Sequence, residues 1–179
     1  MNKNTSARFS IIESLCQYHK GSFLAEGTDD ADFEIRNGVL TKYRGKGGVV
    51  TVPDTVKVIG KNVFANCYNL SVITLPDTLT EIDDNAFEFC TGLRSIALPK
   101  KLKRIGKEAF FGCDSLNEVE LPNSLSTLDA SAFLGCESLY DVTIPKNLKK
   151  ISKSVFLGTA FSERPSPDYE KLVGSGIIV

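Results

Sequence analysis

The sequence lacks several features that would place its function quickly. Its 179 residues carry a formal net charge of −1, so no overall field favours nucleic acid or an anionic membrane. It holds no apolar run of the roughly 20 residues that a membrane-spanning helix needs. Glu13 and Gln17 interrupt the only N-terminal stretch that could serve as the apolar core of a signal peptide. As written, the chain would stay in the cytoplasm, although a mature secreted domain behind a new Met1 would look the same.

Residue patterns that carry catalysis are also scarce. His19 is the single histidine, and no CxxC pair accompanies the five cysteines, so a metal site is not predicted. Cys16 and His19 are three residues apart, but no orienting carboxylate or oxyanion donor can be assigned to them. The glycine-rich stretch at 45–48 lacks the spacing and the Lys-Ser/Thr ending of a phosphate-binding loop. We therefore predict no enzyme, no catalytic residues, no cofactor and no metal.

What the sequence does contain is a repeat of 23 residues. The same step separates the members of three residue columns, which are Pro53, Pro76, Pro99, Pro122 and Pro145, then Phe64, Phe87, Phe110, Phe133 and Phe156, then Cys67, Cys90, Cys113 and Cys136. A period near 23 lies within the range of leucine-rich repeats, so the pattern predicts a solenoid. We expect about five coils over residues 48–161.

Each repeat divides into three pieces. The first is an LxxIxLP strand, in which Ile96 and Leu98 point to the core and Pro99 ends the pairing. The second, with Leu102 and Ile105, is either a short strand or extended chain on the opposite wall. The third is about one helical turn that carries Phe110 inward and ends in a left-handed residue, usually glycine. Stacked coils would place the LxxIxLP strands in a parallel sheet with right-handed crossovers, an α/β repeat.

The segments at the two ends differ from the repeat. Residues 1–31 read as a helix and linker, and the helix either docks on the first coil, binds a partner or belongs to a disordered tail. Residues 32–47 predict a β-hairpin around Asn37-Gly38 that caps the first coil. Residues 162–179 predict an irregular tail, because Pro165 and Pro167 stand near the next strand slot. That tail either folds back through Leu172, Val173 and 177–179 or starts a further segment of a longer chain.

The repeat resembles a known family. The stretch CTGLRSIALPKKLKRIGKEAFFGC has the order of cysteine, LxxIxLP, LxxI and AFxxC that is typical of the BspA-like leucine-rich repeats of bacterial surface proteins. DFEIRNGVLTKYRGKGG, from Asp32 to Gly48, also resembles the segment that often precedes such arrays. The resemblance implies an extracellular or cell-surface, adhesin-like binding role without catalysis. It supplies no fixed catalytic or ligand residues.

The repeated cysteines would lie one above another, about 5 Å apart, a separation compatible with disulfides. A metal ladder is the other chemical alternative. Thr159 fills the fifth slot, however, so the position accepts a small residue that is not a ligand. We therefore interpret them as buried free thiols, because cysteine behaves as a small hydrophobe.

The outward positions of the LxxIxLP strands vary from coil to coil, unlike the core columns. They are either a recognition surface or an ordinary solvated face. The candidate partner-binding residues are Arg94, Asn117, Glu118, Glu120, Tyr140 and Asp141. The expected partner is a protein or a cell-surface ligand, and we expect a monomer.

The opposite wall is more basic. Lys103, Arg104, Lys149 and Lys150 are candidates for binding a polyanion, with Asp114 and Glu137 making the strand side more acidic. Scattered lysines that keep a repeat protein soluble are the simpler alternative. The sequence thus predicts a non-catalytic binding scaffold, with a polyanion-associating protein or a purely structural spacer as alternatives.

Overall fold

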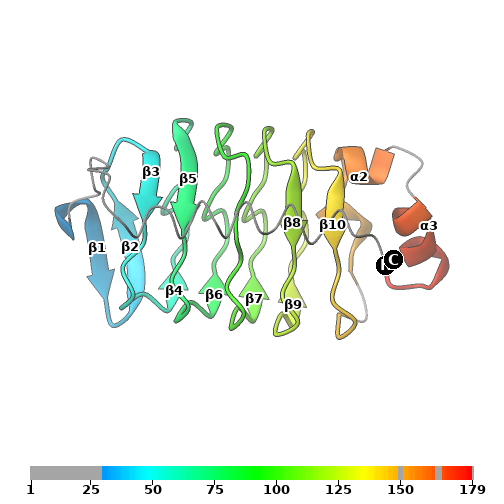
Figure 1. Ribbon diagram of the computed structural model, residues 1–179, viewed down its shortest axis with the longest axis horizontal. Coiled ribbons are helices and arrows are strands. Elements are labelled where there is room, and N and C mark those ends of the chain that lie inside the picture. The colour runs from blue at the N-terminus through cyan, green and yellow to red at the C-terminus, as the bar shows by residue number, and fades with distance from the viewer. Residues whose placement is uncertain (1–29, 149–150, 164–166, 179) are drawn as a thin grey trace, which may run out of the picture.

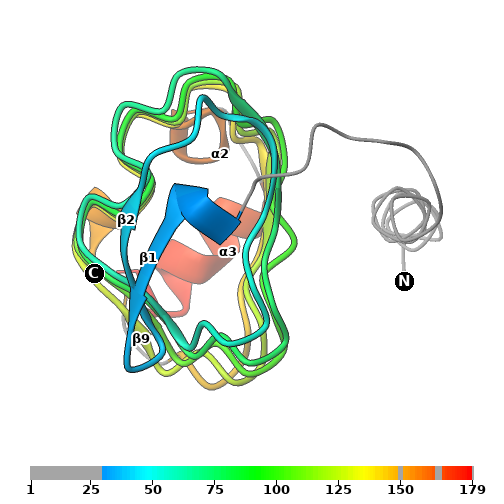
Figure 2. The same ribbon diagram turned by 90° about the vertical axis from the view of Figure 1, so that its left-hand side faces the viewer.

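A computed structural model describes residues 30–148, 151–163 and 167–178, and it shows an elongated solenoid with a hairpin at one end and helices at the other (Figure 1). Viewed along its length, successive coils follow nearly the same outline (Figure 2). The elements, in chain order, are η1 (Asp30–Asp32), β1 (Phe33–Arg36), β2 (Val39–Tyr43), β3 (Gly48–Thr51), β4 (Val58–Ile59), β5 (Leu70–Thr74), β6 (Glu81–Ile82), β7 (Arg104–Ile105), β8 (Glu118–Glu120), β9 (Thr127–Leu128), β10 (Asp141–Thr143), η2 (Lys153–Val155), α2 (Ala160–Glu163) and α3 (Pro167–Gly174). The predicted N-terminal helix within residues 1–29 lies outside the described residues.

The second piece of each repeat forms the longest sheet. Its strands pair in the order β1-β2-β4-β6-β7-β9, and all pairs are parallel except the β1–β2 hairpin. Asn37 and Gly38 have φ values of 52° and 79°, the left-handed conformations that a two-residue hairpin turn requires. Because Leu40 pairs with Ile59, the hairpin extends this sheet and also covers the first coil. We call the sheet the six-stranded wall.

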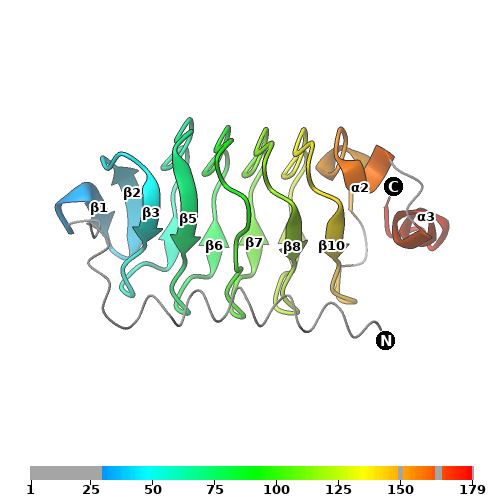
Figure 3. The same ribbon diagram turned by 45° about the horizontal axis from the view of Figure 1, so that its top comes forward.

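The LxxIxLP segments pair less continuously than the sequence predicts. β3 pairs with β5 and β8 with β10, while the segment of the third coil contributes a single bridge, Ser95 to Glu118 (Figure 3). At its outward positions this segment carries Ser95 and Ala97, where β5 carries Val72 and Thr74. The parallel sheet predicted along the LxxIxLP segments is therefore interrupted at the third coil.

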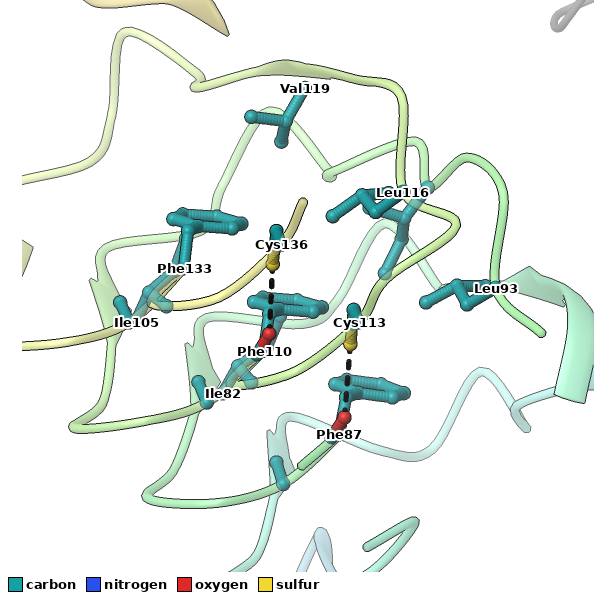
Figure 4. Packing of buried hydrophobic residues seen from close by; sticks show 14 of the residues in the cluster. Ile82, Phe87, Leu93, Ile105, Phe110, Cys113, Leu116, Val119, Phe133 and Cys136 are labelled. Atoms are coloured by element: carbon teal, nitrogen blue, oxygen red, sulfur yellow. Dashed lines mark hydrogen bonds between the residues drawn. The ribbon is translucent and has the colours of Figure 1, made fainter. Parts of the chain in front are cut away.

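The centre of the solenoid is a column of phenylalanine rings. Phe64, Phe87, Phe110 and Phe133 stack with centroids 5.1 Å apart, and Phe156 continues the column at 5.9 Å. All five are buried, in contact with the isoleucines of the six-stranded wall and the leucines of the LxxIxLP segments (Figure 4). Aromatic residues extend this column at both ends, through Tyr43 and Phe33 in the hairpin and through Phe161 and Tyr169 in the C-terminal helices.

The third piece is a pair of turns in the first four coils and a 3₁₀-helix, η2, in the last. Glu108 has a φ of 56°, which breaks a helix at its first turn. The N–H of Phe110 donates to the carbonyl of Ala132 at 2.8 Å and that of Gly112 to Leu134 at 2.9 Å, both in the next coil. The predicted helical turn therefore does not form in the first four coils. There these N–H groups link neighbouring coils and are not free for an i to i−4 hydrogen bond.

Phe89 occupies a left-handed slot that glycine fills in the later coils. Its φ is 55°, and the corresponding residue of the next coil, Gly112, has a φ of 65°. A Cβ on Gly112 would lie 2.5 Å from the Phe89 ring, so the missing side chain makes room for that ring. The ring also packs on Phe111 with centroids 4.9 Å apart, which offsets the backbone strain.

The repeated cysteines are free thiols, as the sequence predicts. Cys90, Cys113 and Cys136 are buried, and each S–H donates at 3.0–3.1 Å to the carbonyl of a core phenylalanine in the preceding coil (Figure 4). Cys67, in the first coil, is only half-buried. The three buried thiols therefore fill the core, and each donates a hydrogen bond to a backbone carbonyl.

Reactivity toward a thiol reagent should distinguish Cys67 from the three buried cysteines. Burial raises the pKa of Cys90 to about 12, and burial also raises the pKa of Cys67 and Cys113. We expect a thiol reagent at pH 8 to modify Cys67 slowly, because the thiolate is the reactive form. Cys90, Cys113 and Cys136 should stay unmodified, because their side chains are buried away from the reagent. In denaturant the same reagent should titrate all five cysteines, and a count of one would indicate two disulfides. Mass spectrometry of the labelled chain measures both.

The last coil is covered by the C-terminal segment. α2 and α3 lie at this end (Figure 1), where the sequence predicted an irregular tail that either folds back on the last coil or starts a further segment. Ile178 is buried and forms a parallel bridge with Ile151, and Leu172 and Ile177 pack on the core, while Val173 is 38% exposed. Proline suits the first position of a helix, so Pro167 opens α3 after ending the repeat.

Candidate functional site

The outward positions of the LxxIxLP segments form one continuous surface, which we call the LxxIxL face. Its members are Val49, Thr51, Ser71, Val72, Thr74, Arg94, Ser95, Ala97, Asn117, Glu118, Glu120, Tyr140, Asp141 and Thr143. Five of the six predicted partner-binding residues lie on β8, β10 or the residue before each. Pairing places Glu118 beside Asp141 and Glu120 beside Thr143. The N–H of Asn117 donates to the carbonyl of Arg94, and that of Tyr140 to the carbonyl of Asn117, each at 3.0 Å. The structure thus brings all six predicted residues onto three successive coils.

Charged side chains on the LxxIxL face make no ion pairs within the part of the chain that the structure describes. This holds for Arg94, Glu118, Glu120 and Asp141, whereas the salt bridges found there involve the hairpin and the six-stranded wall. Tyr140 is 48% exposed, which leaves much of its ring in water. These groups are therefore available for contacts with another molecule.

On the six-stranded wall, in contrast, a group of charges pairs within the chain. Arg104 on β7 binds four carboxylates from the two neighbouring coils. Its guanidinium reaches Glu81 at 2.7 Å, Asp83 at 3.2 Å, Asp84 at 3.0 Å and Asp129 at 2.7 Å. Lys61 extends the network by binding Asp84 at 2.9 Å.

This network corrects the sequence interpretation of Arg104 as a free polyanion-binding residue. Partial burial works against its charged form, but the hydrogen bonds with Glu81, Asp83 and Asp84 and the charge of Asp129 outweigh that effect and raise the pKa of Arg104. An incoming polyanion would compete with four carboxylates already in place. Lys103 is exposed on the same wall, while Lys149 and Lys150 lie outside the described residues.

Sequence reasoning missed the apolar members of the face. Val49 is 38% exposed and Val72 45%, and the two pair across β3 and β5. Tyr68, in the turn that leads into β5, is 58% exposed. The 23-residue step could have identified Tyr68, because Tyr68 stands at the repeat position that holds the polar residues Asp114 and Glu137 in later coils.

Acidic residues surround the other end of the face. Asp114 and Glu137 precede β8 and β10 and lie one coil apart. Partial burial raises the pKa of the Asp114 carboxyl, and the negative charge of Glu137 adds to the effect. No group of three or more histidine, cysteine or acidic side chains within the described residues is arranged to hold a metal ion. The face is therefore suited to noncovalent contacts.

The repeat can now be compared with known proteins. The sequence profile of the BspA type leucine rich repeat region matches residues 46–162 in six copies, where the sequence analysis expected about five coils. This chain belongs to the BspA-type leucine-rich repeat family. The family and its fold are typically non-enzymatic, and leucine-rich repeats generally mediate protein interactions. A comparison with curated proteins found no match.

Solved structures of bacterial leucine-rich repeat proteins are similar to this BspA-type chain. A T. pallidum leucine rich repeat protein is 30% identical with a TM-score of 0.64, and the match covers 74% of this chain and 78% of that one. A leucine-rich repeat protein from Bacteroides ovatus is 33% identical with a TM-score of 0.55, covering 66% of this chain and 36% of that one. A leucine rich cell surface protein from Faecalibacterium prausnitzii is 26% identical with a TM-score of 0.65, and the match covers 74% of this chain and 37% of that one.

The chain thus spans little more than a third of the last two relatives. In the described part of this chain, each helix is too short or too polar to cross a bilayer.

Proposed function

We propose that this BspA-type chain is a non-catalytic scaffold that binds a protein on a cell surface or in the surrounding matrix, through the LxxIxL face. The observation that carries the proposal is the contrast between the two sides of the solenoid. On the six-stranded wall, Arg104 pairs with four carboxylates and Lys61 with one of them, whereas the charges of the LxxIxL face have no ion-pair partner among the described residues. The F. prausnitzii relative is a leucine rich cell surface protein, which supports the cell-surface setting.

An array of purified cell-surface and extracellular-matrix proteins, probed with the labelled chain, tests this function. For any protein that binds, Arg94→Ala and Tyr140→Ala should each weaken binding at least about fivefold, the size expected for an anchor residue at an interface. The melting temperature should stay unchanged, because both side chains are exposed.

Lys101→Ala is the matched control, since Lys101 is exposed and away from the face. Binding that survives both face variants but is lost with Lys101→Ala would place the site elsewhere. A chain that binds none of the arrayed proteins would favour the structural spacer. Retention on heparin that depends on Lys103, Lys149 and Lys150 would favour the polyanion alternative, which the engagement of Arg104 weakens.

A further inference from the structure

The LxxIxL face has two chemically different ends. Its N-terminal end is apolar, with Val49, Tyr68 and Val72 exposed by 38%, 58% and 45%. Of the six large hydrophobic residues most exposed in the described chain, these three and Tyr140 lie on this face or in the turn leading to it. Scattered single residues would need no explanation, but neighbours on adjacent coils form a patch.

The C-terminal end of the face is acidic. Glu118, Glu120 and Asp141 lie on β8 and β10, with Asp114 and Glu137 in the turns just before them. Arg94, on the coil between the two ends, is the one cationic member of the face. The raised pKa of Asp114 reflects in part the charge of Glu137, so the acidic groups repel one another when nothing is bound. A positively charged ligand would relieve that repulsion.

Tyr140 makes the acidic end more selective. Its exposed ring belongs to the residue before Asp141 and stands three residues after Glu137 in the same coil. A ring face beside carboxylates suits a guanidinium or ammonium group, which is attracted by the ring and by the carboxylates together.

We infer that the face binds a polypeptide segment of its partner that carries an apolar side chain and, farther along, a cluster of arginine or lysine. The apolar side chain would contact Val49, Tyr68 and Val72, and the basic cluster would lie over β8 and β10. β5 and β10 are three coils apart, about 14 Å, which about four residues of extended chain would span. This inference rests on the proposed function and adds the chemistry of the partner.

Other classes of ligand fit the face less well. The acidic end repels anionic lipid and polyanions. The described acidic residues are not grouped to ligate a metal ion. A basic peptide segment needs only contacts with separate carboxylates and an adjacent apolar patch, and both are present.

Selection from a phage-displayed library of random 12-residue peptides on the whole chain tests the inference. We expect the selected peptides to be enriched in arginine or lysine, with an apolar residue about four positions from the basic cluster. Binding of a synthetic selected peptide, followed by fluorescence anisotropy, should weaken about tenfold in Glu118→Gln/Glu120→Gln/Asp141→Asn, the order expected for three charge pairs at the surface. Val72→Ser/Tyr68→Ser should weaken it as well.

The matched control removes three exposed carboxylates elsewhere, in Asp54→Asn/Asp77→Asn/Glu170→Gln, and should leave binding within about twofold. Peptides that depend on Tyr140 but show no basic enrichment would overturn the inference and leave the proposed function standing. Peptides insensitive to every face variant would overturn both. Equal losses in the face and control variants would show attraction by overall charge alone and would also overturn the inference.

Discussion

Phe110→Ala should lower the free energy of unfolding by about 3–5 kcal/mol, the cost of deleting a large buried side chain from a packed core. Phe110 is fully buried and stacks between Phe87 and Phe133 at 5.1 Å on either side. Its loss would interrupt the aromatic column in the middle of the solenoid. Because each coil is stabilised by its neighbours, the cavity weakens the contacts of two interfaces at once. Urea unfolding followed by circular dichroism measures the change.

Two further variants make the measurement specific. Phe110→Leu should recover a large part of the loss, since a leucine refills most of the cavity. Tyr140→Ala removes an aromatic ring that is 48% exposed and should change stability by less than about 0.5 kcal/mol. A loss below about 1 kcal/mol for Phe110→Ala would contradict the inward placement of the phenylalanine column.

Arg104→Ala should cost about 2 kcal/mol at pH 7, less than a fully buried ion pair because the Arg104 side chain is 31% exposed. The substitution leaves Glu81, Asp83, Asp84 and Asp129 facing one another without their shared cation. Repulsion among four carboxylates from two coils would then act directly on the six-stranded wall. Thermal unfolding of the two proteins measures the difference.

The effect of Arg104→Ala should depend on pH in a defined direction. The hydrogen bond from Lys61 holds the pKa of the Asp84 carboxyl below its ordinary value, and Arg104 and the N–H of Lys107 contribute despite partial burial. A carboxyl whose pKa is lowered by folding stabilises the protein above the unfolded value of about 3.9 and loses that contribution as the pH falls through the folded pKa. The gap between wild type and variant should therefore be widest near pH 7 and narrow below about pH 4.

Lys101→Ala serves as the control for the wall, since Lys101 is exposed and outside the Arg104 network. It should leave stability within about 0.5 kcal/mol at every pH. A constant gap between wild type and Arg104→Ala from pH 7 to pH 3 would contradict an electrostatic role for Arg104.

The 23-residue step predicts contacts between residues at the same position of successive repeats. It does not predict contacts between residues at different positions of the repeat. Phe87 and Phe110 could be paired from the 23-residue step alone, because stacking brings each residue against its counterpart. Arg104 binds Asp84, although the residue 23 positions after Asp84 is Lys107. The repeat therefore does not predict this contact, which forms because the long Arg104 side chain reaches sideways across the coil. The fit of Phe89 over Gly112 is of the same kind, since it depends on a ring filling the space of a missing side chain.

The candidate site divides in the same way. The six residues predicted for partner binding could be placed on one face, because the repeated apolar positions of LxxIxLP mark the inward residues and leave the variable positions outward. That these residues form no ion pairs with the described chain, and that Arg104 does, could be seen only from the positions of the charges on neighbouring coils.

The sequence by itself determined the repeat, its core columns and its membership in a family of repeat scaffolds, because a strict period makes every neighbour contact a repetition of one pattern. Only the tertiary structure decided which wall carries the continuous sheet, how α3 and Ile178 cover the last coil, and which surface charges stay unpaired. The physical reason is that these features arise where the period ends or where long side chains cross it, and there no repeated pattern fixes the partner.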